Sequence, residues 1–403
     1  MPSNTSTLDL IHSRPPKHTL PRELYREAQS YRDDLEKIWH RDWIFAGHTV
    51  ELPKAGNFMT LQVGDYPVVI VRTDKGDIRA FHNHCRHRGS RLCTASQGRS
   101  PKLVCPYHKW TFSLEGDLIY APTMPEDFDK SDQNLHPVHV GVVNTLIYVC
   151  VAETAPDFDE FKNDLSPFLA VHNLENTKVI HESSIIEQGN WKLVMENNRE
   201  CYHCEANHPE LSLSFLDNPA VSGVAGAEDP ELAAFWDRCE SRGVVSRFKL
   251  HESGRYRMLR TLLTDGAKSY TMDTQPAVKQ RLDNTDLDDI GVLLYFHFPN
   301  TWNHFLGDHA ITFRMLPMSP TETLVTTKWL VPKDAVEGKD YDLENLIKVW
   351  VATNDQDRRL VEETQRGVSS PAYVPGRYSD ISEYGVNQFI DWYCDTMRQR
   401  LAN

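Results

Sequence analysis

The sequence is poor in cysteine, long apolar runs and positive charge. Its 403 residues include 8 unevenly spaced cysteines, so a disulfide scaffold is not expected. No stretch approaches the ~18–20 apolar residues of a membrane span, and the polar, proline-rich start has no apolar signal segment. The net charge of -14 argues against a nucleic-acid partner. These absences favour a cytoplasmic globular protein that binds neither nucleic acid nor membrane.

The composition is otherwise ordinary. Apolar residues make up 40% and charged residues 25% of the chain, as in typical globular proteins. A chain of this length has room for two domains. The first ~20 residues are expected to form a flexible arm. A helix should follow, with Leu35, Ile38 and Trp39 near its end, because their spacing is helical.

After this helix, the sequence predicts two different regions. Short strands at 58–63 and 68–71, bounded by glycines, and a further strand at 146–150 predict a small antiparallel β unit. The rest of the chain predicts a curved antiparallel sheet around a long helix, an arrangement that would form a pocket. Its expected elements are strands at 292–298, 309–316 and 324–331, a turn at 320–322, and helices at about 342–366 and 384–401. The segment 217–290 is polar, irregular and acidic, and indicates no particular element.

Two pairs of ligand-type residues lie in the β unit. They are Cys85 and His87, spaced C-x-H, and Cys105 and His108, spaced C-x-x-H. A [2Fe–2S] cluster with mixed ligation needs two thiolates on one iron and two imidazoles on the other. Imidazole ligands raise the reduction potential, so such a cluster accepts electrons readily. The spacing therefore predicts an electron-relaying cluster.

Other interpretations of these loops are weaker. A Cys₂His₂ zinc site usually has C-x₂₋₄-C and H-x₃₋₅-H spacing. A disulfide between Cys85 and Cys105 would need an oxidising compartment. His82 and His84 are interpreted as loop residues, and Cys93 as a thiol that packs near the cluster.

The second ligand set has the skeleton E-x₂-H-x₄-H, formed by Glu200, His203 and His208. Two histidines and a carboxylate form the facial triad of non-haem Fe(II) oxygenases. The spacing of the histidines does not fit one face of a regular helix. The following proline biases His208 away from helical dihedrals, so a terminating helix could bring both imidazoles to one iron. A surface helix with ordinary histidines, or C-x-x-C chemistry of Cys201 and Cys204, remains open.

The carboxylate can be sought on the long helix near the C-terminus. Its apolar stripe also contains a carboxylate, and the stripe consists of Leu343, Leu346, Ile347, Trp350, Asn354, Asp357 and Val361. A buried carboxylate needs a partner, and a metal is a good one. The alternative is an ion pair between Asp357 and Arg314, while Asp355 falls off the stripe. Glu200 shares a helical face with His203, and could either orient that imidazole or bridge it to a second one.

In this order, the cluster loops, the E-x₂-H-x₄-H skeleton and the late aspartate resemble the α subunit of Rieske non-haem iron oxygenases. The resemblance implies an α+β fold with a small antiparallel β Rieske domain at 45–165. A helix-grip catalytic domain would span 166–403, with the N-terminal arm and helix at 1–44 packed on it. The implied [2Fe–2S] ligands are Cys85, His87, Cys105 and His108, and the implied mononuclear Fe(II) ligands are His203, His208 and Asp357.

The resemblance also implies an assembly and an activity. Glu200 would link His203 to His108 of the partner subunit in a head-to-tail homotrimer. The glutamate, where aspartate is commoner, and its setting at 190–204 resemble the branch that oxidises quaternary ammonium compounds. The expected activity is O₂-dependent N-demethylation of a betaine, such as proline betaine or glycine betaine, with release of formaldehyde. Electrons would come from NAD(P)H through a flavin/iron–sulfur reductase.

Substrate contacts follow from the charge of such a substrate. Aromatic faces bind a cation that has no N–H group, and Arg314 could hold a carboxylate. The aromatic candidates are Tyr202, Phe296, Phe298 and Trp302, for which core packing is the alternative. Other activities stay open: an oxygenase acting on an aromatic ring or on an amine such as choline or carnitine, an electron-transfer iron–sulfur protein, and a zinc-stabilised binding module.

Overall fold

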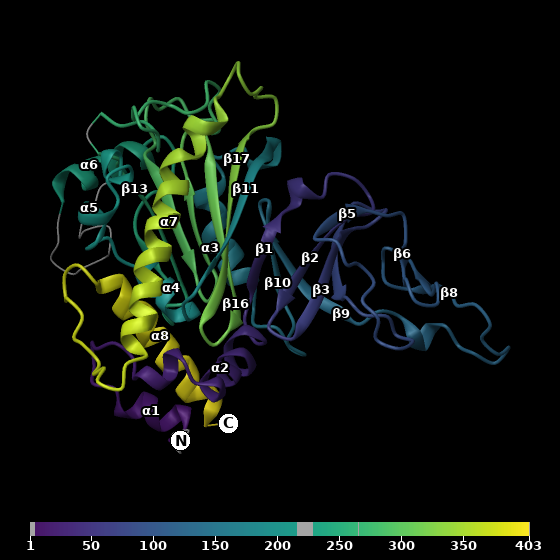
Figure 1. Cartoon of the computed structure of the whole chain (residues 1–403). Helices are drawn as coiled ribbons and strands as arrows, with labels where there is room; N and C mark the ends of the chain where they lie inside the picture. The colour runs from purple at the N-terminus through teal and green to yellow at the C-terminus, as the bar shows by residue number, and fades with distance from the viewer. Residues whose placement is uncertain (1–4, 216–228, 265, 403) are drawn as a thin grey trace. The chain divides into compact units, whose positions relative to one another are not determined.

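The computed structural model describes residues 5–215, 229–264 and 266–402. The chain forms two compact units, shown in Figure 1. One unit is Trp39–Lys162, and the other combines Met1–Ile38 with Asn163–Asn403. No helix among the described residues is long and apolar enough to cross a membrane.

The unit Trp39–Lys162 is built from antiparallel strands. Its seven-stranded sheet has the order β1-β10-β9-β4-β3-β2-β5, and a three-stranded sheet has the order β6-β7-β8. The strands are β1 (Ile44–His48), β2 (Asn57–Val63), β3 (Tyr66–Arg72), β4 (Ile78–His82), β5 (Gln97–Arg99), β6 (Leu103–Val104), β7 (Thr111–Phe112), β8 (Leu118–Tyr120), β9 (Pro137–Val143) and β10 (Leu146–Cys150).

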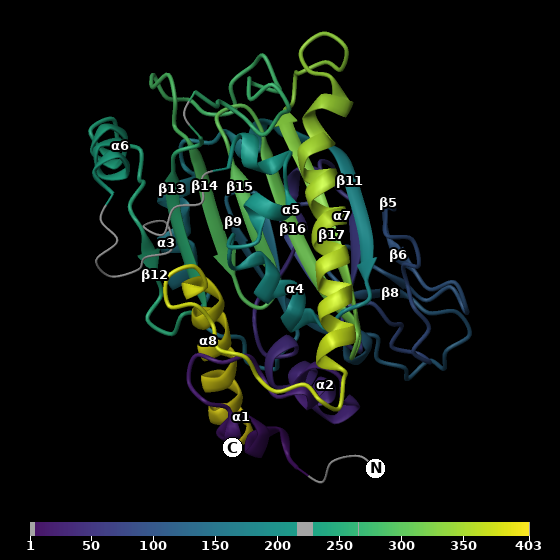
Figure 2. The same cartoon turned by 60° about the vertical axis from the view of Figure 1, so that its left-hand side comes forward.

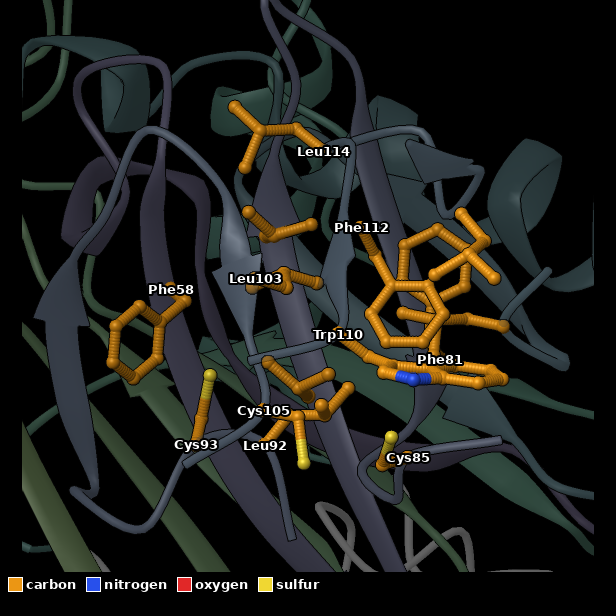
Figure 3. Close-up of a cluster of buried hydrophobic side chains, with 14 residues drawn as sticks. Phe58, Phe81, Cys85, Leu92, Cys93, Leu103, Cys105, Trp110, Phe112 and Leu114 are labelled. Carbon is orange, nitrogen blue, oxygen red and sulfur yellow. The ribbon is translucent and has the colours of Figure 1, made fainter. Parts of the chain in front are cut away.

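A buried apolar cluster lies within this unit, and Figure 3 shows its side chains. It includes Phe81, Trp110 and Phe112 together with three cysteines, Cys85, Cys93 and Cys105. The cluster brings the loops between β4 and β5 and between β6 and β7 to a common apolar core. The two cysteine-containing loops are thereby held on a rigid base.

The larger unit contains one seven-stranded antiparallel sheet of order β11-β17-β16-β15-β14-β13-β12. Its strands are β11 (Thr177–Glu187), β12 (Lys249–Leu250), β13 (Tyr256–Thr261), β14 (Val292–His297), β15 (Thr301–Phe305), β16 (Ala310–Ser319) and β17 (Glu322–Pro332). Helix α7 (Leu343–Val368) runs along the β11, β16 and β17 part of this sheet in Figure 2. The Asp342 carboxylate begins the helix by accepting a hydrogen bond from the Asn345 amide at 2.8 Å.

Shorter helices complete the fold. They are α1 (Thr7–Ser13), α2 (Ala28–Asp34), α3 (Asp159–Leu169), α4 (Trp191–Asn198), α5 (Cys204–Asn207), α6 (Pro230–Glu240) and α8 (Tyr384–Leu401). Helix α2 continues into a π-helical turn over Leu35–Trp39. In Figure 2, α4 and α5 lie on the same face of the sheet as α7.

The α+β fold class and the three late strands predicted from the sequence are confirmed. The expectation of a flexible arm over the first ~20 residues is wrong for the described part. Residues Thr7–Ser13 form α1, in which Leu10 and Ile11 are buried and Ser6 accepts a capping hydrogen bond from Asp9. Within 217–290, residues 217–228 and 265 lie outside the described residues, and the described remainder includes α6, β12 and β13.

Candidate metal centres and active site

The two cysteine loops adopt the same turn. The carbonyl oxygen of Cys85 accepts a hydrogen bond from Gly89 at 2.9 Å, and that of Cys105 accepts one from Lys109 at 3.1 Å. Gly89 and Lys109 both have positive φ, at 77° and 61°. Each turn places a histidine between its cysteine and its positive-φ residue. The two imidazoles meet, since the ring centroids of His87 and His108 lie 4.7 Å apart.

This arrangement fits a [2Fe–2S] cluster. Cys85 and Cys105 are 2% and 1% exposed, and burial raises the pKa of the Cys85 thiol to about 11. Coordination to iron would deprotonate such a thiol. The Nδ1 atom of His108 is buried and has no hydrogen-bond partner among the described residues, so it is available as a ligand. Cys93 packs in the same apolar core, where its amide N–H donates to Asn83 Oδ1 at 2.9 Å.

The second ligand set comes from a one-turn helix. His203 precedes α5 and His208 ends it, with φ of -122° and ψ of 70° directly before Pro209. Because the helix stops there, the two imidazoles turn toward one another, with ring centroids 4.9 Å apart. The terminating helix predicted from the histidine spacing is therefore what the chain forms.

Helix α7 supplies the carboxylate. Asp357 Oδ1 lies 3.3 Å from His203 Nε2 and 3.0 Å from His208 Nε2. The two Nε2 atoms are 3.0 Å apart. Ligands at right angles around an ion, with bonds of about 2.1 Å, are about 3.0 Å from one another. The three atoms thus have the spacing of a facial triad. Asp355 instead is exposed and pairs with Arg358.

Neighbouring side chains fix which imidazole nitrogen faces the triad. Glu200 Oε1 lies 2.6 Å from His203 Nδ1, and Gln356 Oε1 lies 2.8 Å from His208 Nδ1. Each oxygen accepts the Nδ1 proton, which leaves Nε2 for a metal. The sequence interpretation missed Gln356. Its position directly before Asp357 was the available signal.

The protonation of this group reflects its shared hydrogen bonds. Burial lowers the pKa of His203, but hydrogen bonds to Asp357 and Glu200 outweigh burial and raise it to about 9. Burial would raise the pKa of Asp357, yet the hydrogen bonds from His203 and His208 lower it overall. A divalent cation can replace the shared protons, because it needs the same deprotonated atoms.

The triad borders a cavity. Its wall contains the three residues of the triad, the aromatic rings of Phe215, Phe296 and Trp350, and several polar groups. The lining residues are Asn197, Asn198, Arg199, Glu200, Cys201, His203, Cys204, His208, Leu211, Phe215, Arg257, Leu294, Phe296, His304, Trp350, Thr353 and Asp357. A mixed lining with a few convergent polar groups is typical of a small-molecule site.

Four of the predicted substrate contacts do not line this cavity. Tyr202 is 68% exposed. Phe298 packs against Phe389 and Trp392 of α8, and Trp302 stacks on Phe313 with ring centroids 5.2 Å apart. Arg314 pairs with Thr301 in the sheet, whereas Phe313 pairs with Trp302. Since alternate residues of a strand face opposite sides, Arg314 lies on the other face of the sheet from Phe313 and Trp302.

Cys201 and Cys204 form a disulfide in the loop between Glu200 and His208, with Cα atoms 4.9 Å apart. The sulfur atoms are therefore joined to each other, while His203 and His208 face the aspartate. This pairing separates the C-x-x-C motif from the ligand set, although both occupy the same nine residues.

Comparison with known proteins agrees with this geometry. Residues 42–145 match the family described as Rieske [2Fe-2S] domain, and residues 174–399 match the family described as ring hydroxylating alpha subunit (catalytic domain). The chain is 46% identical over 402 residues to the glycine betaine monooxygenase oxygenase subunit of Chromohalobacter salexigens, covering 98% of this chain and 89% of the relative.

Two further matches are more distant. The carnitine monooxygenase oxygenase subunit of Acinetobacter pittii is 31% identical over 401 residues, with 92% of each chain covered. A solved structure of a quaternary ammonium Rieske monooxygenase superposes with a TM-score of 0.75 at 22% identity, covering 98% of this chain and 99% of that chain. The structural match shows the shared fold.

Fold, ligand geometry and sequence together define an oxygenase with two iron centres. The chain belongs to the Rieske non-haem iron oxygenases, as the α subunit that carries both centres. Its cofactors are a [2Fe–2S] cluster and a mononuclear non-haem iron. An electron-transfer protein or a zinc-stabilised binding module is thereby excluded.

Proposed function

We propose that this chain is the oxygenase component of a monooxygenase that removes an N-methyl group from a small betaine. Glycine betaine is the first substrate to test, and proline betaine is the second. The observation that carries the proposal is the triad of His203, His208 and Asp357 at the wall of a cavity that also holds aromatic rings and guanidinium groups. The 46% identity to a glycine betaine monooxygenase subunit supports the same substrate class.

The cavity suits a quaternary ammonium group. Such a cation has no N–H to donate, so neutral aromatic faces and carboxylates are its natural surroundings. Trp350 is 5% exposed and lines the cavity. A desolvated ring of this kind contributes about 2 kcal/mol to cation binding when it is well placed.

The net reaction accounts for all atoms. The betaine, one O₂, two electrons and two protons give the demethylated amine, formaldehyde, one water and one proton. Bound iron supplies the O₂ activation that a protein side chain cannot. The protein positions the N-methyl group beside the triad, and Gln356 and Glu200 keep the two imidazoles oriented.

Electron supply is part of the proposal. NAD(P)H would reduce a flavin/iron–sulfur reductase, which reduces the cluster held by Cys85, His87, Cys105 and His108. In a head-to-tail homotrimer, Glu200 would connect His203 to His108 of the partner subunit. The dependence on NAD(P)H is also the reason to expect the cytoplasm as the compartment.

The test is formaldehyde release with a competent reductase, NADH and a panel of N-methyl compounds. Glycine betaine or proline betaine should yield about one formaldehyde per O₂ consumed. Choline, carnitine and aromatic rings are the competing substrates in the panel. Turnover of one of these, with no turnover of either betaine, would contradict the proposal.

The role of Glu200 is tested separately. Glu200→Gln keeps the size of the side chain but removes its charge, so both metals should remain while coupled turnover is lost. Single-turnover spectroscopy of the pre-reduced protein follows the cluster directly. Product formation at the wild-type rate in Glu200→Gln would exclude Glu200 as the link.

A further inference from the structure

Arg199 is a buried cation at the wall of the active-site cavity. It follows α4 as the C-cap residue and is 2% exposed. Its Nη2 donates to Gln388 Oε1 at 2.8 Å. Its Nε and Nη1 atoms are buried and have no hydrogen-bond partner among the described residues. A buried guanidinium with unused donors is costly unless a ligand satisfies it.

A second guanidinium lies against the same aromatic ring as the first. Arg257 of β13 is 4% exposed and lines the same cavity. The central guanidinium carbons of Arg199 and Arg257 lie 4.1 Å and 5.1 Å from the centre of the Phe296 ring. Burial, followed by the charge of Arg257, lowers the pKa of Arg199 well below its ordinary value. Two buried cations at the wall of one cavity favour an anion there, because a nearby opposite charge stabilises their charged forms.

The acidic residues of the cavity are already engaged. Glu200 accepts a hydrogen bond from His203, and Asp357 lies at the centre of the triad. An anion for Arg199 must therefore come with the ligand. A carboxylate is the matching group, because it has only acceptors and forms charge-assisted hydrogen bonds to guanidinium donors.

We propose that Arg199, supported by Arg257, binds the carboxylate of the substrate and thereby selects zwitterions over simple quaternary cations. The assignment rests on the proposed N-demethylation and names the group that determines its substrate class. A short zwitterion anchored at Arg199 presents its N-methyl groups to the rest of the same cavity, where the His203, His208 and Asp357 ligand atoms converge. Choline-type cations have no group to satisfy the buried donors.

The backbone at this position is held firmly. A Cβ on Gly385 of α8 would lie 2.2 Å from the backbone oxygen of Arg199 and 3.2 Å from its Nη2. The absence of a side chain therefore lets α8 contact the arginine directly. With Gln388 also on α8, the helix fixes both the backbone and one side of the guanidinium.

The experiment compares two substrates of equal size, glycine betaine and its neutral amide, N,N,N-trimethylglycinamide. Both carry the same cation, and only one carries a carboxylate. Arg199→Gln should lower the ratio of kcat/KM for betaine over amide by about 10- to 100-fold, mainly through KM, because a charge-assisted hydrogen bond is lost. Arg199→Lys should restore part of the preference, since it keeps the charge.

Matched arginine variants separate the competing explanations. Arg242→Gln, at an exposed ion pair, is the control for removal of a positive charge. Arg314→Gln tests the arginine on the opposite face of the sheet. A betaine preference within about twofold of wild type in Arg199→Gln, or a larger shift in Arg314→Gln, overturns the assignment. Iron content and cluster absorbance verify that each variant is loaded.

Titration calorimetry on the wild-type holoenzyme gives an independent readout. It should show glycine betaine binding at least 10-fold more tightly than the amide, and equal affinities would overturn the assignment even if Arg199→Gln does not fold. If the wild-type enzyme releases formaldehyde from neither of these compounds nor from proline betaine, the proposed function fails. If it demethylates betaine while Arg199→Gln keeps the preference, only the role of Arg199 fails.

Discussion

A buried ion pair supports the helix that leads into the active site. The side chains of Lys192 and Asp34 are fully buried, and Lys192 Nζ donates to Asp34 Oδ2. Asp34 also accepts hydrogen bonds at 2.9 Å from Trp191 Nε1 and from the Tyr393 hydroxyl. The aspartate therefore joins α2, α4 and α8. Helix α4 continues directly into Arg199, so this network holds the approach to the cavity.

Lys192→Met removes the ammonium group and preserves most of the side-chain volume. It leaves Asp34 buried with two neutral donors and no counter-ion, and breaking a buried pair in this way costs about 3–5 kcal/mol. Burial already raises the pKa of Asp34 even though Lys192 lowers it. Loss of the lysine should raise that pKa further.

The pH dependence has a definite sign. A carboxyl whose pKa is higher in the folded than in the unfolded state binds more protons when folded, so stability falls as pH rises between the two values. The loss of unfolding free energy in Lys192→Met, relative to wild type, should therefore be larger at pH 7.5 than at pH 5.5. Adding Asp34→Asn removes the stranded charge and should recover more than half of the loss.

Urea unfolding, followed by tryptophan fluorescence, measures these differences, while absorbance of the cluster reports separately on the other unit. Wild type, both single variants and the double variant complete a thermodynamic cycle. A loss below about 1 kcal/mol in Lys192→Met, or a double variant no more stable than Lys192→Met, would refute the view that the pair balances two buried charges.

Three further predictions concern the metal centres and the support of α8. Cys85→Ser should bleach the visible spectrum, because one cluster iron loses a thiolate, and unchanged absorbance and sulfide content would contradict this. Asp357→Ala should lose the mononuclear iron but keep the cluster, whereas Asp355→Ala should keep both in iron analysis. Gly385→Ala should lower the free energy of unfolding by about 1–3 kcal/mol, because the added Cβ would lie 2.2 Å from the backbone oxygen of Arg199. The control Gly376→Ala, where a Cβ would have no atom within 4 Å, should leave the melting temperature nearly unchanged.

The proximity of His87 to His108 and of His203 to His208 could be predicted because the information for it is local. Two short loops bring the cluster ligands together, and Pro209 ends the helix that turns His208 toward His203. Asp357 lies 149 residues after His208, so no local spacing connects the two. The signal is its place in an apolar helical stripe, because a buried carboxylate needs a partner. The same reasoning separated it from Asp355, which is exposed.

Which of the aromatic candidates line the cavity could not be predicted, because strand periodicity gives a face but not a position along it. Phe296 and Trp302 are directly paired in the sheet and so share a face. Phe296 lines the cavity, whereas Trp302 is covered by Phe313. Phe298, two residues after Phe296, packs against α8. Whether each ring lines the cavity or is covered depends on segments distant in sequence, and no local pattern specifies their positions.

Arg199 escapes sequence analysis for a related reason. An arginine at the end of a short helix, beside an acidic residue, is the pattern of a solvated surface pair. In the folded chain Glu200 faces His203, and Arg199 faces Phe296 and the cavity. The helix ends at Asn198, so the two neighbours leave the backbone in different directions. One turn of chain thus delivers an acidic group to the metal ligand and a cation to the cavity, and the loss of either charge should affect a different step: turnover for Glu200, and recognition of the carboxylate for Arg199.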